Sequence, residues 1–408
     1  MNTRELHCVI TPVPTFRVGI ARCESYRPEH TQKALQQAVA RAGGWPTLPS
    51  SVLLKANLLA PRAPEDAATT HPAILKSVIQ ELRRGQPDRD ITVADTPGFL
   101  YAHQREELFE RTGLRALAEE VACGVEILSD SGFSLVAPPG ARALLQAQVA
   151  TKFLTAPAVI NVAKLKTHVE TKISACLKNL FGIADTPTRK RAHAARDTRH
   201  LLHAIVDLST VRPPVFSVLD AVEAMEGNGP SHGKPKFLGW ILVGENALAV
   251  DMVAAHMMGY ADPRRIPLLE VAMRRGIGPT HKDQITLEGA TWEAIFCQDV
   301  HKPTALMDWV PPALKGFLYQ ITALRPDLDR EKCISCGICA RVCPVDAITM
   351  ISGHPEVDRG QCVCCMCCHE MCPPGAMRCQ PSFLAQLMLR WRPQTVSSGT
   401  SGDSHSTR

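Results

Sequence analysis

The sequence lacks the features of a membrane-spanning or exported protein. No stretch approaches about 18 uninterrupted apolar residues, the length that a transmembrane helix needs. The first residues, MNTRELHCVITPVPTF, do not place a charged segment before a long apolar one, so we expect no secretory signal and a cytoplasmic location. The net charge of +5 over 408 residues is small and dispersed, which argues against a nucleic-acid partner.

Cysteine is the unusual part of an otherwise ordinary composition. Hydrophobic residues make up 45% and charged residues 21%, which excludes wholesale disorder. Eleven of the 16 cysteines lie between Cys333 and Cys379. A secreted disulfide framework would not be concentrated in this way on a chain without a signal peptide. The composition therefore predicts a large ordinary domain and a small metal-dense one.

Over the first 300 residues, short apolar runs bounded by turn residues alternate with helical patterns. The runs predict strands at 16–21, 52–59, 91–94, 125–128, 159–162, 215–219 and 241–243. The helical patterns lie at 28–42, 72–83, 104–110, 114–122, 171–180, 198–208 and 247–258. This alternation predicts an α/β fold over 1–297, with a mainly parallel sheet and helices on both faces.

Two cysteine runs with the spacing C-x-x-C-x-x-C-x-x-x-C-P lie 29 residues apart. They comprise Cys333, Cys336, Cys339 and Cys343, then Cys362, Cys365, Cys368 and Cys372. This is the pattern of bacterial ferredoxins with two [4Fe–4S] clusters, in which the fourth cysteine of each run binds the other cluster. The predicted ligand sets are therefore Cys333, Cys336, Cys339 and Cys372 for one cluster, and Cys362, Cys365, Cys368 and Cys343 for the other.

The cysteine region predicts a small α+β ferredoxin-like domain over 327–380, after a linker at 298–326. Zinc normally takes two separated ligand pairs, so the doubled run argues against it. Two clusters form a relay that carries one electron at a time, which implies an electron donor or acceptor protein as partner. For residues 381–408, the sequence pattern predicts a short apolar helix followed by a disordered tail. The cysteines outside the pattern are expected to pack beside the clusters, with ligand swapping left open: Cys364, Cys367 and Cys379.

In the large domain, polar residues follow predicted strands, where a βα fold places its ligands. The candidates for binding a cofactor or substrate are Lys55, Asn57, Lys164, Lys178, Asn179, Gly227, Asn228, Gly229 and Asp251. If the lysines converge, they form a cationic pocket for a carboxylate, a phosphate or an acidic cofactor. Taken singly, such residues are usually solvated loop charges or turns.

Three residues are the candidates for catalysis. His168 has an unperturbed pKa near neutrality, so it is the natural proton donor or acceptor, with Lys166 as an alternative. Glu226, like Asp251, could orient His168 or pair with the lysines. The basic run at 189–203 is expected to be a solvated helix face. Nucleotide hydrolysis is excluded because the sequence has no G-x-x-x-x-G-K-[ST] motif.

Taken together, these segments resemble the domain-of-unknown-function family 362, an uncharacterised iron–sulfur-associated family in which ferredoxin modules often follow. The resemblance covers roughly residues 18–259. Its most specific pieces are Lys-Thr-His at 166–168, Lys-Asn-Leu-Phe-Gly at 178–182 and Met-Glu-Gly-Asn-Gly-Pro at 225–230. The sequence departs from it at Ala56, where we expect proline, and at Ala221, where we expect glycine. The resemblance implies no particular reaction.

Three functions are consistent with the sequence, in order of preference. The first is an iron–sulfur oxidoreductase that passes electrons through two [4Fe–4S] clusters to a small anionic substrate or cofactor in the α/β domain. The second is a non-catalytic electron-transfer subunit of a partner enzyme. The third is an iron–sulfur cluster scaffold. A further organic cofactor is left open.

Overall fold

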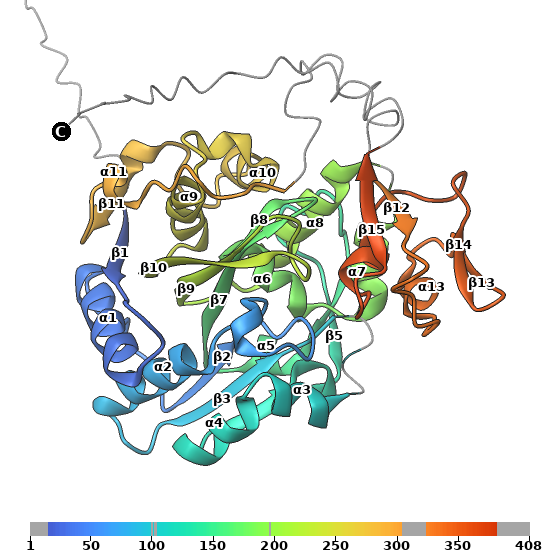
Figure 1. Cartoon of the computed structure of the whole chain (residues 1–408). Helices are drawn as coiled ribbons and strands as arrows, with labels where there is room; N and C mark the ends of the chain where they lie inside the picture. Colours follow the sequence, from blue (N-terminus) through green and yellow to red (C-terminus); the bar gives the residue numbers. More distant parts are fainter. Residues whose placement is uncertain (1–14, 99–100, 102–103, 196, 304–323, 382–408) are drawn as a thin grey trace, which may run out of the picture.

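A large sheet forms the centre of the α/β domain. The computed structural model describes residues 15–98, 101, 104–195, 197–303 and 324–381. Within them the sheet runs in the order β11-β1-β10-β9-β7-β2-β3-β4, with β8 paired to β7 (Figure 1). The strands are β1 (Phe16–Arg22), β2 (Ser51–Lys55), β3 (Asp90–Asp95), β4 (Gly124–Ile127), β7 (Ala158–His168), β8 (Lys172–Ser174), β9 (Phe216–Glu226), β10 (Lys234–Gly244) and β11 (Ile285–Glu288).

The sheet is mainly parallel, as the sequence predicts. Among the described pairings, β10 runs antiparallel to β1 and β9, and β8 runs antiparallel to β7. The pairs β2–β3, β2–β7, β3–β4, β7–β9 and β1–β11 are parallel. Each predicted strand overlaps one of these strands, because long buried apolar runs are what a doubly covered parallel sheet requires.

Helices cover both faces of the sheet, which confirms the predicted layering (Figure 1). One face packs against α1 (Pro28–Arg41), α2 (Pro72–Arg84), α3 (Arg105–Arg111) and α4 (Leu114–Val121). The other packs against α5 (Thr151–Thr155), α6 (Cys176–Asn179), α7 (Thr186–His193), α8 (Thr198–Val211), α9 (Ala247–Met257), α10 (Pro267–Arg274) and α11 (Trp292–Ile295). Alternate residues of β7 serve the two cores, Ile160 and Val162 on one side and Val159 and Ala163 on the other. No helix in the described residues is long and apolar enough to cross a membrane.

The predicted helix at 171–180 is wrong in its first half. Lys172–Ser174 forms β8, which folds back on the end of β7, and α6 spans only Cys176–Asn179. Lys172 takes a positive φ of 67°, which a helix does not allow. A hairpin of β5 (Phe133–Val136) and β6 (Ala147–Ala150) is a further element that the sequence pattern does not predict.

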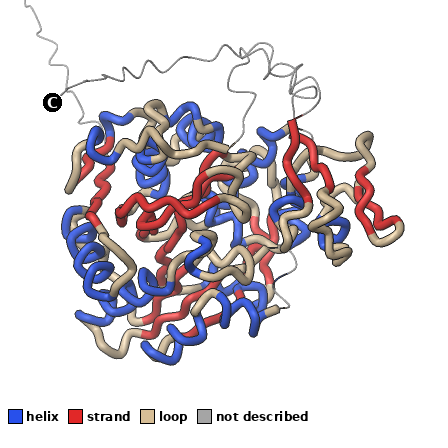
Figure 2. The backbone as a smooth tube through the Cα atoms, viewed as in Figure 1, coloured by secondary structure: helices blue, strands red, loops and turns tan. Residues whose placement is uncertain are grey.

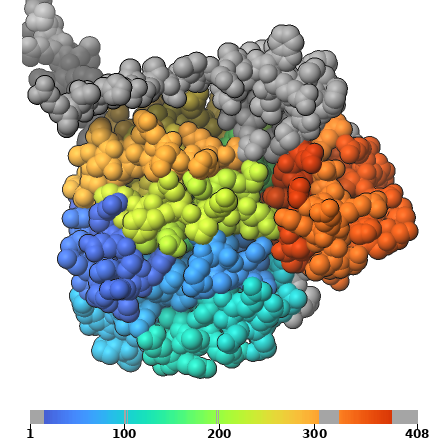
Figure 3. Space-filling model, viewed as in Figure 1, coloured from blue at the N-terminus to red at the C-terminus, as the bar shows by residue number. Residues whose placement is uncertain are grey.

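A small domain follows at the side of the α/β domain; it is the dark-orange and red part at the right of Figure 3 and lies at the same place in Figure 2. It contains β12 (Leu324–Leu328), α13 (Ile338–Val342), β13 (Ile348–Ile351), β14 (His354–Val357), α14 (Cys367–Glu370) and β15 (Met377–Pro381). β12 pairs with β15 and β13 with β14, all antiparallel. Most of the predicted linker and all of the predicted C-terminal helix and tail lie outside the described residues.

The small domain packs on the loops that follow β2 and β3. Tyr101 and Ala60 form one apolar cluster with Cys367 and Met371. A Cβ atom added to Gly98 would lie 2.8 Å from Cε of Met371, so the two chain segments approach closely there. Because strands β2 and β3 end at this edge of the sheet, the small domain covers the place where a βα fold binds its ligands.

Candidate metal centres and the polar junction beside them

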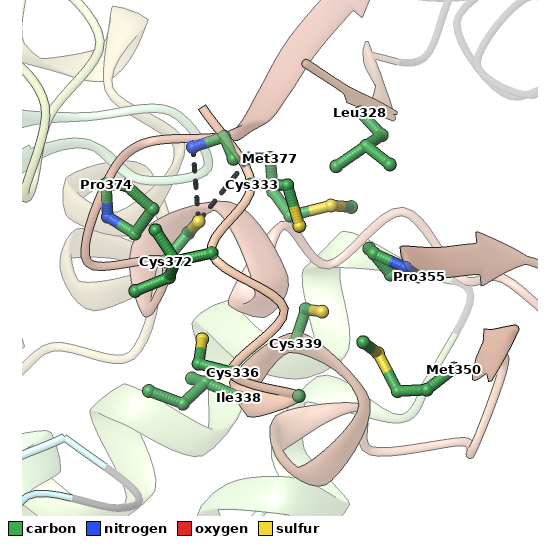
Figure 4. A pocket seen from close by; sticks show the side chains of 13 residues that line it. Leu328, Cys333, Cys336, Ile338, Cys339, Met350, Pro355, Cys372, Pro374 and Met377 are labelled. Atoms are coloured by element: carbon green, nitrogen blue, oxygen red, sulfur yellow. Dashed lines mark hydrogen bonds between the residues drawn. The ribbon is translucent and has the colours of Figure 1, made fainter. Parts of the chain in front are cut away.

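The eight cysteines of the two runs divide between two pockets of the small domain. The first is lined by Cys333, Cys336, Cys339 and Cys372, with Leu328, Met350, Pro355 and Met377 around them (Figure 4). The second is lined by Cys343, Cys362, Cys365 and Cys368, with Ile348 and Met366 among the others. The spaces measure about 310 and 300 Å³, open mouths included. Each pocket thus takes three cysteines from one run and the fourth from the other.

Backbone amides point at several of these sulfur atoms. Sγ of Cys343 accepts a hydrogen bond from the amide of Ala347, and Sγ of Cys372 accepts one from Ala376, both at 3.2 Å. Such bonds favour the thiolate form, which is the form that binds metal. Four soft thiolate donors around a space of this size fit an iron–sulfur cluster.

The polar residues of the α/β domain meet the small domain at His168, the last residue of β7. Nε2 of His168 lies 3.1 Å from Oε1 of Glu370 in α14. Nδ1 accepts hydrogen bonds from the amides of Glu170 and Thr171, at 3.2 and 3.4 Å. Because Nδ1 is the acceptor, the ring proton of a neutral His168 lies on Nε2, the atom that faces Glu370. Burial lowers the pKa of His168, so the ring is neutral near pH 7.

Three further residues complete what we call the polar junction, defined as His168, Glu170, Lys178, His193 and Glu370. Oε2 of Glu170 lies 3.6 Å from Nδ1 of His193. Burial raises the pKa of Glu170 well above its usual value, and the charge of Glu370 adds to this. Burial lowers the pKa of His193 to about 3, with a smaller contribution from Lys178. Burial thus disfavours the charged form of Glu170, whereas Glu370 lies against His168.

The junction offers three ligand atoms that lie within 4.8 Å of one another, from His168, Glu170 and Glu370. A metal ion would need the lone pair of Nε2 on His168, since Nδ1 already accepts two amide hydrogens. Nε2 carries the proton instead. We therefore interpret the set as a cluster of closely spaced polar groups between which protons can pass, rather than as a metal site.

Lys55 is buried at the end of β2 and is neutralised there. Its Nζ lies 2.6 Å from Oδ1 of Asp95 and donates to the carbonyl oxygens of Ala56 and Asn179, at 2.9 and 3.0 Å. Oδ2 of Asp95 accepts from the amide of Leu58 at 2.7 Å. The pair joins the ends of β2 and β3, so Lys55 does not contribute an open positive charge.

Lys164 is neutralised in the same way. It is the neighbour of Asp220 across β7 and β9, and the two form an ion pair of 2.9 Å in which both side chains are fully buried. Lys164 also donates to Oη of Tyr26 at 2.8 Å, and Tyr26 donates to Asp220 at 2.9 Å. The ring of His71 stacks on Tyr26, with centroids 3.6 Å apart. Tyr26 and His71 precede α1 and α2, so these contacts hold the starts of both helices against the sheet.

Lys166 lies between that ion pair and the junction, and its partners are neutral oxygens. Its Nζ donates to Oδ1 of Asn57 at 2.8 Å and to the carbonyl of Ala68 at 2.7 Å. Burial, and then the charge of Lys178, lower the pKa of Lys166 to about 7. Asn57 donates in turn to Asn179 at 3.1 Å. The structure thus brings together five predicted site residues, namely Lys166, His168, Lys178, Asn57 and Asn179.

Glu226 and the loop after it have other partners. Oε1 of Glu226 lies 2.9 Å from Nδ1 of His301, and the amide of Gly227 donates to the carbonyl of His301 at 2.7 Å. Gly229 lies so close to β7 that an added Cβ atom would be 2.2 Å from the carbonyl oxygen of Thr167. The loop that contains Asn228 therefore supports β7, and Glu226 does not orient His168.

Asp251 serves the local structure of α6. It is buried in α9 and accepts hydrogen bonds from the amides of Cys176 and Leu177, at 2.7 and 2.9 Å. These amides begin α6, where backbone donors have no helical partner. Burial nonetheless raises the pKa of Asp251 to about 7. Asp251 is thus a buried cap and contacts neither His168 nor the lysines through these bonds.

Sequence reasoning missed several residues that shape the site. Glu370 lies inside the second cysteine run, where the sulfur ligands dominate the pattern, and Glu170 follows His168 by two positions. The expected solvated face at 189–203 is wrong at Arg189 and His193, which are both buried. Their spacing of four places them on one side of α7, so this signal was present in the sequence.

Comparisons with known proteins agree with this architecture. A family described as "4Fe-4S binding domain" matches residues 326–349, so the chain carries an iron–sulfur cluster-binding domain. The thylakoid-associated protein sll1697 of Synechocystis sp. (strain ATCC 27184 / PCC 6803 / Kazusa) is 27% identical over 270 residues, which is 64% of this chain and 80% of that protein.

A solved structure, the lactate racemase apoprotein from Thermoanaerobacterium thermosaccharolyticum, is similar with a TM-score of 0.38 and 10% identity. The match covers 60% of this chain and 57% of that one, so this chain spans less than two thirds of its length. A family described as "Domain of unknown function (DUF362)" matches residues 52–256. That match covers half of the sequence, and the chain belongs to the DUF362 family.

Proposed function

We propose that the protein is an iron–sulfur oxidoreductase in which each cysteine pocket holds a [4Fe–4S] cluster and the polar junction is the chemical site. The observation that carries this proposal is the contact of 3.1 Å between Nε2 of His168 and Oε1 of Glu370. Glu370 lies between two proposed ligands, Cys368 and Cys372, so the cluster loop touches the proton-holding group directly. When bound, the clusters would supply one-electron transfer.

The side chains of the polar junction would hold and transfer protons and would bind the negative charge of the substrate. His168 would hold a proton on Nε2, and burial raises the pKa of Glu170, which favours its protonated form. Lys178 is half-buried, whereas Lys166 and His168 are covered. Lys178 would therefore be the first to meet a small anionic substrate, and Lys166 would bind it next to Asn57. A proton from His168 would accompany each electron that reaches the substrate.

A non-catalytic electron-transfer subunit is the second candidate. It is favoured by the ion pairs of Lys55 with Asp95 and of Lys164 with Asp220, which remove two of the charges expected in a cationic pocket. In either case the partner is an electron donor or acceptor protein. The cytoplasmic location stays a prediction, and the Synechocystis relative is described as thylakoid-associated.

The cluster assignment is tested by counting iron in protein purified without oxygen. The wild-type chain should hold about eight iron atoms, and Cys336→Ala and Cys365→Ala should each hold about four or fewer. Cys364→Ala and Cys367→Ala are matched controls in the same loop and should keep about eight. Equal losses in the control variants would contradict the ligand sets, and zinc in place of iron would contradict the whole proposal.

The role of the junction is tested by proton uptake. Wild-type protein is reduced stepwise in weakly buffered solution, and the protons taken up per electron are recorded. His168→Gln should retain its iron and its capacity for electrons but take up fewer protons. His281→Gln, an exposed histidine, is the control. Unchanged proton uptake in His168→Gln would remove His168 from the mechanism and favour the electron-transfer subunit.

A further inference from the structure

The two cysteine runs have the same spacing but different surroundings. Since they are 29 residues apart, each position of the first has a counterpart in the second. Ile334 is 64% exposed, whereas its counterpart Val363 is half-buried. Cys336 is exposed, whereas its counterpart Cys365 is half-buried. Residues of the first run beside its pocket are therefore more exposed than their counterparts in the second run.

The cover on the second run comes from the α/β domain. Cys367 is fully buried in the apolar cluster that Tyr101 and Ala60 supply. Glu370, which lies 3.1 Å from His168, is in the same helix as Cys368, so the second pocket lies next to the polar junction. The two pockets thus have different neighbours, the junction for the second and the surface for the first.

The centre of the surface around the first pocket is apolar, and the exposed charged residues Lys332 and Glu356 flank it in the sequence. Ile351, at the end of β13, is 47% exposed. The turn after it lies against the first run, since a Cβ atom added to Gly353 would be 3.4 Å from Oγ of Ser335. Residues 333–339 and 347–355 contain no Asp, Glu, Lys or Arg. We call this surface the outer face, made of Ile334, Ser335, Cys336, Ile351 and Gly353; it belongs to the projecting domain in Figure 3.

We propose that the outer face is the docking surface for a one-electron carrier protein, one that presents its cofactor at an apolar, uncharged edge. This inference rests on the proposed function of the clusters. The occupant must be a redox protein because a proposed cluster ligand, Cys336, is exposed within the face itself. A partner seated on Ile334 and Ile351 would bring its cofactor as near to the first cluster as the protein allows.

The exchange is a single electron. In the reducing direction, the carrier's cofactor is oxidised by one electron, and the cluster in the first pocket is reduced by one. No bond forms or breaks, and no proton is required at this face. Small apolar contacts of this kind are typical of transient redox complexes.

The test is anaerobic stopped-flow kinetics on the cluster-loaded full-length protein. The probes are flavodoxin hydroquinone as donor, ferricytochrome c as acceptor from the reduced protein, and reduced methyl viologen as a small-molecule donor. The variant Ile334→Gln/Ile351→Gln makes the face polar without adding charge. Its control is Leu135→Gln/Leu145→Gln, which alters two exposed leucines of the α/β domain, 58% and 76% exposed.

We expect the rate constant with either protein carrier to fall about tenfold or more in Ile334→Gln/Ile351→Gln, equivalent to about 1.4 kcal/mol of contact. The viologen rate and the iron content should stay within twofold of wild type, as should all rates of the control. Ile351 lies outside the cysteine run, and the single variant Ile351→Gln should show part of the decrease in the rate constant.

Unchanged carrier rates in the double variant, with normal viologen reduction, would overturn the docking surface and leave the cluster relay intact. Failure of both carriers to exchange electrons with wild-type protein that viologen reduces would overturn it as well. A wild-type chain that lacks iron or resists viologen would instead contradict the proposed function.

Discussion

The buried ion pair of Lys55 and Asp95 gives the sharpest test of how the family's polar residues are used. Nζ and Oδ1 lie 2.6 Å apart, and the side chains are 0% and 4% exposed. Asp95→Asn keeps the size of the side chain but removes the charge that balances Lys55. Breaking such a pair by removing one partner costs about 3–5 kcal/mol of unfolding free energy, because a buried charge is left without compensation.

The pH dependence of this loss has a definite sign. Burial already lowers the pKa of Lys55, and the charge of Asp95 opposes that effect. In Asp95→Asn the folded-state pKa falls further below the unfolded value of about 10.4. The unfolded state then binds more protons, so the stability of the variant rises with pH up to that value. The difference from wild type should therefore shrink between pH 7 and pH 10.

The assay is urea denaturation followed by circular dichroism at 222 nm, without oxygen so that the clusters stay bound. The control is Glu126→Gln, which breaks the more exposed pair with Lys152 and should cost about 1 kcal/mol or less. Lys55→Met/Asp95→Leu should be more stable than Asp95→Asn alone, since no charge remains unpaired. If Asp95→Asn costs no more than Glu126→Gln, the structural role that we assign to Lys55 is wrong.

Two further predictions concern the junction and the domain contact. Since burial lowers the pKa of His193 to about 3, the unfolded state binds one more proton than the folded state between pH 6.5 and 3. The free energy of unfolding should therefore fall by up to about 1.4 kcal/mol for each unit that the pH decreases in this range. His193→Asn should reduce this pH dependence, measured by denaturation at pH 5, 6 and 7, whereas the control His281→Asn should not. Gly98→Val should displace Met371 and weaken the contact of the small domain with the α/β domain, so that trypsin releases the small domain faster. The control is Gly85→Val, because no atom lies within 4 Å of a Cβ added at Gly85. Equal rates of digestion in the two variants would contradict the close contact at Gly98.

The sheet and its helices could be predicted from the sequence because local apolar periodicity determines both. The first error lies at 171–180, where Thr171 and Ile173 favour a strand and Lys172 takes a positive φ. The site was harder, because its partners come from distant segments. Asp95 is 40 positions from Lys55, and Asp220 is 56 positions from Lys164. Only the register of β2, β3, β7 and β9 shows that each pair meets.

Strand β7 explains why the family's polar residues looked like one site and act as two groups. Lys164, Lys166 and His168 alternate along it, and their partners change in order from the carboxylate of Asp220 through neutral oxygens to Glu370 of the small domain. The charge of Lys164 is thus compensated by Asp220, Lys166 has neutral partners, and only the end of β7 reaches a cluster loop. Substitutions should divide accordingly. Changes at Lys164 should lower stability and leave the reduction of intact protein unaltered, whereas changes at His168 should spare stability and alter the protons taken up with each electron. If Lys164→Met shifted proton uptake as strongly as His168→Gln at equal iron content, the charge of Lys164 would belong to the junction after all, and the separation along β7 would fail.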